Sequence, residues 1–153
     1  MSDAEKRLAD LGLTLPEAAA PVANYVPYVR SGQQIFVSGQ ISLGPDGLVK
    51  GRLGESMNVE QGQAAARLCG LNLIAQLKAA LDGDLSRLVR VVKLGGFVCA
   101  TPEFAAIPKV INGASDLMVE AFGEAGRHAR SAVSCPALPL GAAVEVDAIF
   151  EMA

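Results

Sequence analysis

The chain has 153 residues, 51% of them hydrophobic, and fits a single domain, residues 1–153, that can bury a core without disulfide staples. Its apolar runs are interrupted by Gly, Lys or Arg well before the roughly 18 residues that a transmembrane helix needs. A net charge of −3 with no run of Lys and Arg argues against nucleic-acid binding. One histidine and three cysteines without a CxxC spacing leave almost no zinc ligands, so we expect no metal and reduced thiols.

The amino-terminal segment predicts a short helical extension of about residues 1–20. Ser2 can cap a helix that reaches Leu11, and Gly12 ends it. An extended connector rich in alanine and proline then runs to Pro21. Because this amino terminus is charged and lacks an apolar signal core, we expect a cytoplasmic protein.

Two strands are predicted next, from Tyr25 to Arg30 and from Gln34 to Ser42, because β-branched and aromatic residues dominate both. The Ser31-Gly32 pair between them is typical of a hairpin turn. A second turn, from Gly44 to Gly47, precedes a short extended piece around Leu48 to Gly51. This part of the chain is therefore expected to form a β-hairpin.

Two amphipathic helices follow, with a valine-rich strand between them. Asn58 and Gln61 have the spacing of a capping box, and apolar residues then recur at helical spacing. The strand runs from Leu88 to Ala100, and we expect it to be central. The second helix begins at Pro108 and is closed by Gly126. With the strands on either side, this order predicts an α+β fold whose two main helices pack on one face of a mixed β-sheet.

The stretch HARSAVSCPALPLGAAVEVDAIFE, residues 128–151, predicts two strands joined by a short turn. On the first strand, Arg130 and Ala132 share one face by the period of two. On the second, Glu145 and Asp147 point away from an apolar face. The sequence therefore sets a lone arginine and a carboxylate on two strands connected by a turn.

This stretch, together with YVPYVRSGQQIFVSGQIS at residues 25–42, resembles the RidA (YjgF-type) family of reactive enamine/imine deaminases. Relatives in that family are often labelled endoribonuclease L-PSP or translation inhibitor. The resemblance covers nearly all of the chain from about Asn24 to Glu151. It implies a chorismate mutase-like fold, a homotrimer with clefts between subunits, and hydrolysis of 2-imino acids to 2-keto acids and ammonia without a cofactor.

The resemblance also implies roles for individual residues. Arg130 would clamp the carboxylate of a small 2-imino acid, since a guanidinium matches a carboxylate with two parallel hydrogen bonds. Glu145 would hold or partly deprotonate the attacking water. Tyr25, Ser38 and Gly39 would line the same cleft.

The sequence departs from the family pattern at Ala132, where the best-known members carry cysteine two residues after the arginine. A thiol-dependent step is therefore not expected. Water can still be held at that position by the backbone carbonyl, which every residue supplies. The helix asparagine of the family cannot be placed securely on Asn112, so the resemblance assigns this residue no definite role.

Three charged residues of the last two strands, Arg130, Glu145 and Asp147, also have structural interpretations. An arginine in a strand commonly pairs with a surface carboxylate, and that would account for Arg130 without any ligand. Glu145 and Asp147 are equally consistent with the solvated side of an edge strand, and the resemblance alone favours Glu145 over Asp147.

Other singled-out residues have similarly ordinary alternatives. Tyr25 is as consistent with the core as with a cleft, and Ser38 with satisfying backbone groups in a turn. His128 is predicted to lie at a helix end or on the surface rather than to act as an acid or ligand. Cys99 and Cys135 are predicted to be small buried hydrophobic residues.

Two further functions remain open beside imine hydrolysis. One is a noncatalytic trimer that binds small carboxylates or client proteins. The other is a ribonuclease or translation inhibitor, as the family labels suggest, although the sequence has neither a histidine pair nor a basic groove. We expect a small 2-imino or 2-keto acid as the partner, with neither membrane nor nucleic acid.

Overall fold

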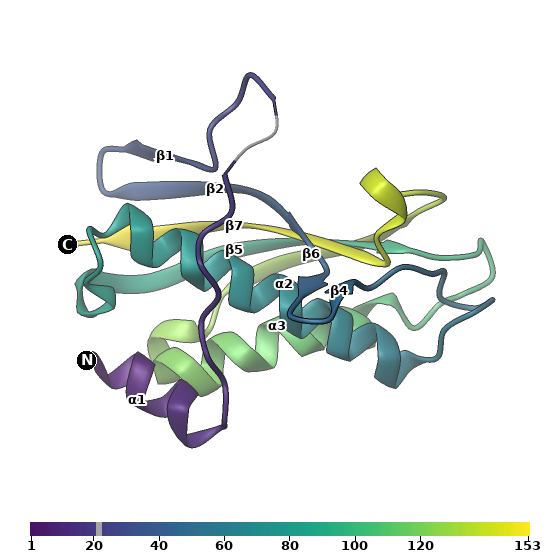
Figure 1. Cartoon of the computed structure of the whole chain (residues 1–153), viewed down its shortest axis with the longest axis horizontal. Helices are drawn as coiled ribbons and strands as arrows, with labels where there is room; N and C mark the ends of the chain where they lie inside the picture. Colours follow the sequence, from purple (N-terminus) through teal and green to yellow (C-terminus); the bar gives the residue numbers. More distant parts are fainter. Residues whose placement is uncertain (21–22) are drawn as a thin grey trace.

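The centre of the molecule is a five-stranded mixed sheet, seen in a computed structural model that describes residues 1–20 and 23–153 (Figure 1). The far end of the predicted connector, at Pro21, lies outside the described residues. The strands are β1 (Tyr28–Ser31), β2 (Gln34–Ile41), β3 (Leu43–Gly44), β4 (Gly47–Leu48), β5 (Leu88–Cys99), β6 (Ala129–Cys135) and β7 (Val144–Met152). Their order in the sheet is β1-β2-β7-β5-β6, and β3 pairs with β4 in a separate hairpin. The β5–β6 pair is parallel, and the other pairs are antiparallel.

Both main helices lie on one face of this sheet (Figure 1). Helix α2 (Val59–Ala80) packs on β2 and β7, α3 (Ile107–Phe122) packs on β5 and β6, and the short α1 (Asp3–Asp10) rests against α3. Three 3-10 helices complete the fold: η1 (Leu85–Arg87), η2 (Gly123–Gly126) and η3 (Pro139–Gly141). The predicted α+β fold, with two main helices on one face of a mixed sheet, is confirmed.

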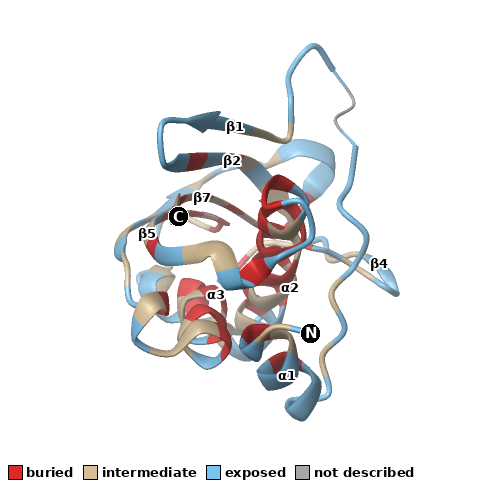
Figure 2. Cartoon of the chain, turned by 90° about the vertical axis from the view of Figure 1, so that its left-hand side faces the viewer, coloured by how far each residue is buried: buried red, intermediate tan, exposed pale blue. Residues whose placement is uncertain are grey.

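The core fills the space between these helices and the sheet, and Figure 2 shows buried segments along both α2 and α3. Strand β7 contributes the apolar face that its alternation predicted, because Val144, Val146, Ala148 and Phe150 are at most 3% exposed. Burying a side chain such as Phe150 completely is worth about 1.5–3 kcal/mol. The same alternation sends Glu145 and Asp147 to the opposite face of the sheet.

Local signals at the helix starts are confirmed. Ser2 and Glu5 form a capping box on α1, and Asn58 and Gln61 form one on α2. Each box satisfies two backbone N–H groups that have no partner within the helix. A proline in the first turn of α3, Pro108, needs no such partner.

The strand order corrects the expectation for the last two strands. Strands β6 and β7 exist as predicted, but β5 lies between them and pairs with both. The turn-like segment after Cys135 is therefore a crossover past the end of β5 and not a hairpin. Strand β5 is interior, as expected, but β7 occupies the middle of the sheet.

Element ends differ from the prediction at two places. Strand β1 begins at Tyr28, so Tyr25 precedes it. Helix α3 ends at Phe122, because Gly123 adopts a left-handed backbone (φ +61°), and the predicted end at Gly126 closes η2 instead.

The face of the sheet opposite the helices is not covered by any described helix. Apolar side chains on this open face include Val29, Phe36 and Val133, which are 40–50% exposed. Register places Ile149 beside Phe36, and Glu145 in the row of Val133. Within the described chain, every helix is too short or too polar to cross a membrane.

Candidate functional site

Arg130 lies on the edge strand β6, and its side chain points toward α3. Its Nη1 donates to Asn112 Oδ1 at 2.8 Å and to Ser115 Oγ at 3.2 Å. No described Asp or Glu forms an ion pair with it. The alternative of a surface ion pair for Arg130 therefore does not describe this structure: neutral oxygens hold a half-buried cation.

His128 extends this set of contacts, since its Nε2 lies 2.9 Å from Ser115 Oγ and its Nδ1 lies 2.6 Å from the Gly126 carbonyl oxygen. Burial lowers the pKa of His128, the bond to the Gly126 carbonyl opposes that shift, and the nearby Arg130 charge adds to it. We call Asn112, Ser115, His128 and Arg130 the arginine cluster. His128 does sit at the end of a short helix, as predicted, but its ring is engaged and half-buried.

Glu145 and Asp147 lie on β7, on the open face, and each is half-buried. Burial raises the pKa of Glu145, and the Asp147 carboxylate raises it further. Burial also raises the pKa of Asp147, against the lowering effects of a backbone hydrogen bond from Gly95 and of Lys93. Neither carboxylate is simply the solvated side of an edge strand, because β7 is the middle strand.

Glycine at position 39 allows the Glu145 side chain to lie against the backbone of β2. A β-carbon there would lie 2.6 Å from Glu145 Oε2. This close approach occurs where the β2–β7 register shifts, between Val37 and Gln40. Gly39 and Glu145 are therefore neighbours, as the implied cleft requires.

Ser38 mainly satisfies the backbone before β1. Its Oγ donates to the Val26 carbonyl at 2.8 Å, and its N–H donates to the Pro27 carbonyl at 2.9 Å. Tyr25 stands beside this turn and is 51% exposed, which rules out the core for this residue within one chain. Both residues thus border the same edge of the sheet as Gly39.

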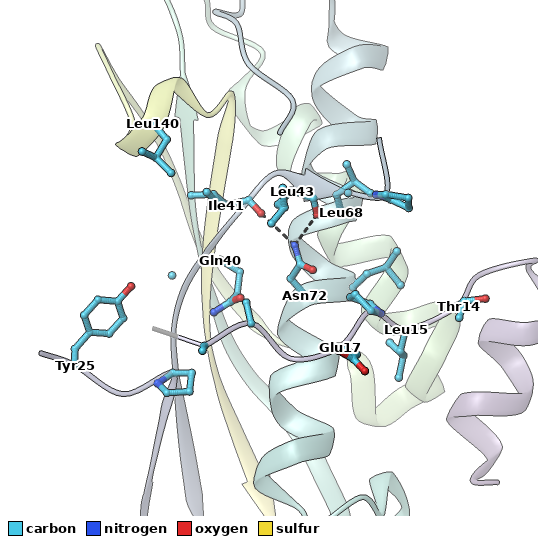
Figure 3. Close-up of a pocket in the computed structure, with 18 residues that line it drawn as sticks. Thr14, Leu15, Glu17, Tyr25, Gln40, Ile41, Leu43, Leu68, Asn72 and Leu140 are labelled. Carbon is cyan, nitrogen blue, oxygen red and sulfur yellow. Dashed lines mark hydrogen bonds between the residues drawn. The ribbon is translucent and has the colours of Figure 1, made fainter. Parts of the chain in front are cut away.

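A cavity of about 640 Å³, which we call the edge cavity, opens at this edge of the sheet and is shown in Figure 3. Tyr25 and Gly39 line it, together with Leu68 and Leu71 of α2 and the connector segment at residues 14–20. The lining is mostly apolar. The sequence signals did not indicate that the connector would form a wall.

Polar side chains fasten two walls of the edge cavity. Asn72 Nδ2 donates to the carbonyls of Ile41 and Leu43, at 3.2 and 2.9 Å, and Gln76 Nε2 donates to the Ala19 carbonyl at 2.8 Å. Asn72 thus ties β2 to α2, and Gln76 ties the connector to α2.

A single chain does not bring the two halves of the implied site together. Register places Arg130 in the row of Leu94 and Ala148, whereas Glu145 lies in the row of Val133. The two residues are thus on strands two spacings apart, about 10 Å, and on opposite faces of the sheet. Ala132 lies on β6 with Arg130, while Tyr25, Ser38 and Gly39 lie at the opposite edge of the sheet, and Glu145 reaches Gly39 from the middle strand.

Sequence reasoning did not assign the contacts that Arg130 makes with Asn112 and Ser115, or the contact of Ser115 with His128. One signal was present, since Asn112 and Ser115 are three residues apart and therefore share a face of α3. Their distance to Arg130 depends on how α3 lies across β6, which no local signal encodes.

Cys99 is 6% exposed, as expected of a small buried residue, but Cys135 at the end of β6 is only partly buried. Among the described residues, no three His, Cys, Asp or Glu side chains cluster so that they could hold a metal ion.

A mixed sheet with two helices on one face, an arginine on the edge strand and a carboxylate on the middle strand defines a chorismate mutase-like α+β protein. Residues 5–152 match the family described as "YjgF/chorismate_mutase-like, putative endoribonuclease". The chain belongs to this YjgF/RidA family.

Individual relatives agree with this assignment. The chain is 54% identical to Protein TCP17 of Trypanosoma cruzi over 147 residues, which are 95% of this chain and 91% of that protein. The crystal structure of Atu1372 from Agrobacterium tumefaciens, a protein described as having unknown function, superposes with a TM-score of 0.92 at 50% identity, covering 98% and 92% of the two chains. The crystal structure of RidA from an Antarctic Psychrobacter superposes with a TM-score of 0.59 at 27% identity, covering 89% of this chain and 94% of that one.

Proposed function

We propose that this protein hydrolyses small 2-imino acids, formed from enamines, to 2-keto acids and ammonia at sites between neighbouring copies of the chain. The observation that carries the proposal is Arg130, a half-buried cation held by neutral partners. Its Nη2 and Nε make no hydrogen bond to any described residue, so one edge of the guanidinium is available to a carboxylate. Bidentate binding there would orient the adjacent C=N carbon.

A second copy is needed to complete the site. One copy would supply Arg130 and Ala132 from its β6 edge, and its neighbour would supply Glu145, Gly39 and Tyr25. The open face supports such an assembly, because exposed apolar residues lie on it and no described helix covers it. Closed threefold symmetry would give a homotrimer with three equivalent sites, as the family resemblance implies.

The chemistry requires both protons of the water to reach nitrogen. Glu145, as the carboxylate, would accept the first proton while the oxygen attacks the imine carbon, and would return it to nitrogen to give a tetrahedral carbinolamine. The same carboxylate would then take the hydroxyl proton and pass it to the amino group as the C=O bond forms and the C–N bond breaks, which would release ammonia and the 2-keto acid. A raised pKa suits Glu145 to both steps. The backbone carbonyl of Ala132 would hold the water without a thiol.

The edge cavity supports substrates that carry an apolar side chain. It is large enough for several carbon atoms beyond the reacting centre, and its walls at Leu68 and Leu71 are apolar, while Glu17 of the connector is the charged residue of its lining. Among 2-imino acids, those with longer aliphatic or thioether side chains would therefore be hydrolysed with lower KM than the smallest ones.

The test is the release of 2-keto acid from an imine generated in situ by an amino-acid oxidase or dehydratase. We expect Arg130→Ala to lose at least about 100-fold in kcat/KM, equivalent to about 2.7 kcal/mol. Arg127→Ala is a matched control, because Arg127 is exposed and pairs with Glu124 instead. Equal kcat/KM for wild type and Arg130→Ala would overturn the assignment of the clamp.

A binding protein without catalysis is the second candidate, because the arginine cluster alone can hold a carboxylate. Saturable binding of a 2-keto acid that needs Arg130, with no hydrolysis of any imine tested, would favour it. Ribonuclease activity has less support, since the sole histidine has a lowered pKa and both ring nitrogens engaged.

A further inference from the structure

We propose that Ser115 and His128 are positioning residues for Arg130: a neutral His128 fixes the direction of the Ser115 hydroxyl, and that hydroxyl fixes the guanidinium. The role in turnover rests on the proposed function, whereas the hydrogen-bond chain itself does not. Three elements meet here, since Ser115 comes from α3, Gly126 from η2, and Arg130 from β6.

The protons in this chain can be assigned from what each atom is able to do. The Gly126 carbonyl only accepts, so His128 Nδ1 carries the proton of that 2.6 Å bond. Arg130 only donates, so Ser115 Oγ accepts from Nη1. The Ser115 hydroxyl proton is then left for His128 Nε2, which must be unprotonated to accept it.

Protonation of His128 would disrupt this assignment of hydrogen-bond donors and acceptors. An Nε2–H group would donate to the same Ser115 oxygen that already accepts from Arg130, and the hydroxyl proton would lose its acceptor. A second positive charge would also face the guanidinium. Asn112 would then hold Arg130 without help from Ser115, and the guanidinium would be less well directed.

The charged groups on the surrounding elements do not offset this charge. On β6 the neighbour is Arg130 itself, which lowers the pKa of His128. Lys93 of β5 acts on Asp147, and Glu124 of η2 pairs with Arg127. Asp116, next to Ser115 on α3, is exposed. Acidification should therefore weaken carboxylate binding as His128 gains its proton.

Because His128 is the chain's sole histidine, the tautomer can be read without ambiguity from ¹⁵N NMR of the imidazole. We expect the neutral Nδ1–H form, with a titration midpoint below the usual value of about 6.5. An Nε2–H tautomer, or a midpoint at or above the usual value, would overturn the hydrogen-bond chain. This measurement needs no substrate, so it stands even if no imine is hydrolysed.

The functional readout is the pH dependence of KM for a 2-imino acid, or of Kd for a 2-keto acid if there is no turnover. In the wild type, either constant should rise several-fold as pH falls through the His128 titration. Ser115→Ala should raise KM several-fold at neutral pH, with kcat less affected, and should flatten this dependence. Ser115→Thr keeps the hydroxyl and should restore both.

Ser134→Ala, on the same strand as Arg130 but exposed, is the matched control and should behave as wild type. A merely structural role for Ser115 would lower the melting temperature of Ser115→Ala and leave the pH profile of KM or Kd unchanged, and that result would overturn the proposal. Failure of the proposed function alone would appear differently, as the expected tautomer and Kd profile without hydrolysis.

Discussion

The arginine cluster and the edge cavity are built in different ways. The arginine cluster is a set of hydrogen bonds between side chains of α3, η2 and β6, already formed within one chain. The edge cavity is formed by backbone and apolar side chains, with the Glu145 carboxylate lying against Gly39 at its border. One region can hold a charge, and the other can accept a side chain and direct water. Because the two regions are separate in one chain, the proposed hydrolysis would need a second copy of the chain to bring them together.

The largest expected effect tests whether the arginine cluster and Glu145 of each site come from different copies, and it is obtained by mixing two inactive variants. Arg130→Ala would remove one half of each site and Glu145→Gln the other, so each variant alone should be inactive. After co-expression, random assembly should restore about a quarter of the sites, because only those pairing an intact arginine half with an intact carboxylate half would function. The measurement is 2-keto acid release per milligram of the mixed protein.

Activity that remains at zero in mixtures with demonstrated subunit exchange would contradict a site between copies. The matched control is co-expression of Arg130→Ala with the double variant Ser115→Ala/Arg130→Ala. Both chains lack the Arg130 side chain, so the mixture should recover no activity.

A smaller difference, in kcat, should distinguish the roles of Glu145 and Asp147, the two carboxylates of β7. Gly39→Ala would push a β-carbon to 2.6 Å from Glu145, and Gly95→Ala would push one to 2.4 Å from Asp147. Each substitution crowds a carboxylate of the same strand, so their effects on the melting temperature should be similar. We expect Gly39→Ala to lower kcat by 10-fold or more and Gly95→Ala by less, because Glu145 is the proposed base.

The measurement is kcat for both variants beside their thermal unfolding. An equal loss of kcat would contradict the preference for Glu145 over Asp147, which sequence resemblance suggested and burial does not decide, since both carboxyl groups have raised pKa values.

The elements of the fold were largely predictable because their signals are local. The capping boxes at Ser2 and Asn58 and the alternation along β7 each depend on residues within a few positions of one another. The position of β5 between β6 and β7 was not predictable in this way. Parallel pairing of β5 with β6 depends on contacts far apart in sequence, which a turn-like connecting segment does not reveal.

The site shows the same contrast between local signals, which the sequence reveals, and contacts distant in sequence, which it does not. Motifs indicated Arg130 and Glu145, but a one-dimensional pattern could not reveal that they face opposite sides of the sheet. Nor could it reveal that the connector at residues 14–20 forms a wall of the edge cavity, because its alanines and prolines carry no periodic signal. Contacts that join three elements, such as those of Ser115, become visible only once the elements are packed.

The smallest expected effect concerns the ion pair that joins α1 to α2. Lys78 of α2 donates to Glu5 of α1, and this bond, aided by the backbone N–H of Ser2, lowers the pKa of Glu5 to about 2. Glu5→Gln keeps the capping box, since glutamine also serves there, and removes the charge and the hydrogen bond that Glu5 shares with Lys78. We expect a loss of about 0.5–1 kcal/mol in the free energy of unfolding near neutral pH. Asp3→Asn, in an exposed pair with Lys6, is the control and should cost less.

The sign of the pH dependence follows from the lowered pKa of Glu5. The folded state binds the Glu5 proton less tightly than the unfolded state, so the contribution is present above the ordinary value of 4.5 and disappears as pH falls toward about 2. Denaturant unfolding of wild type and Glu5→Gln across this range should therefore give curves that converge at acidic pH. A difference that persists unchanged at low pH would mean that the variant acts through packing of α1 and not through the charge.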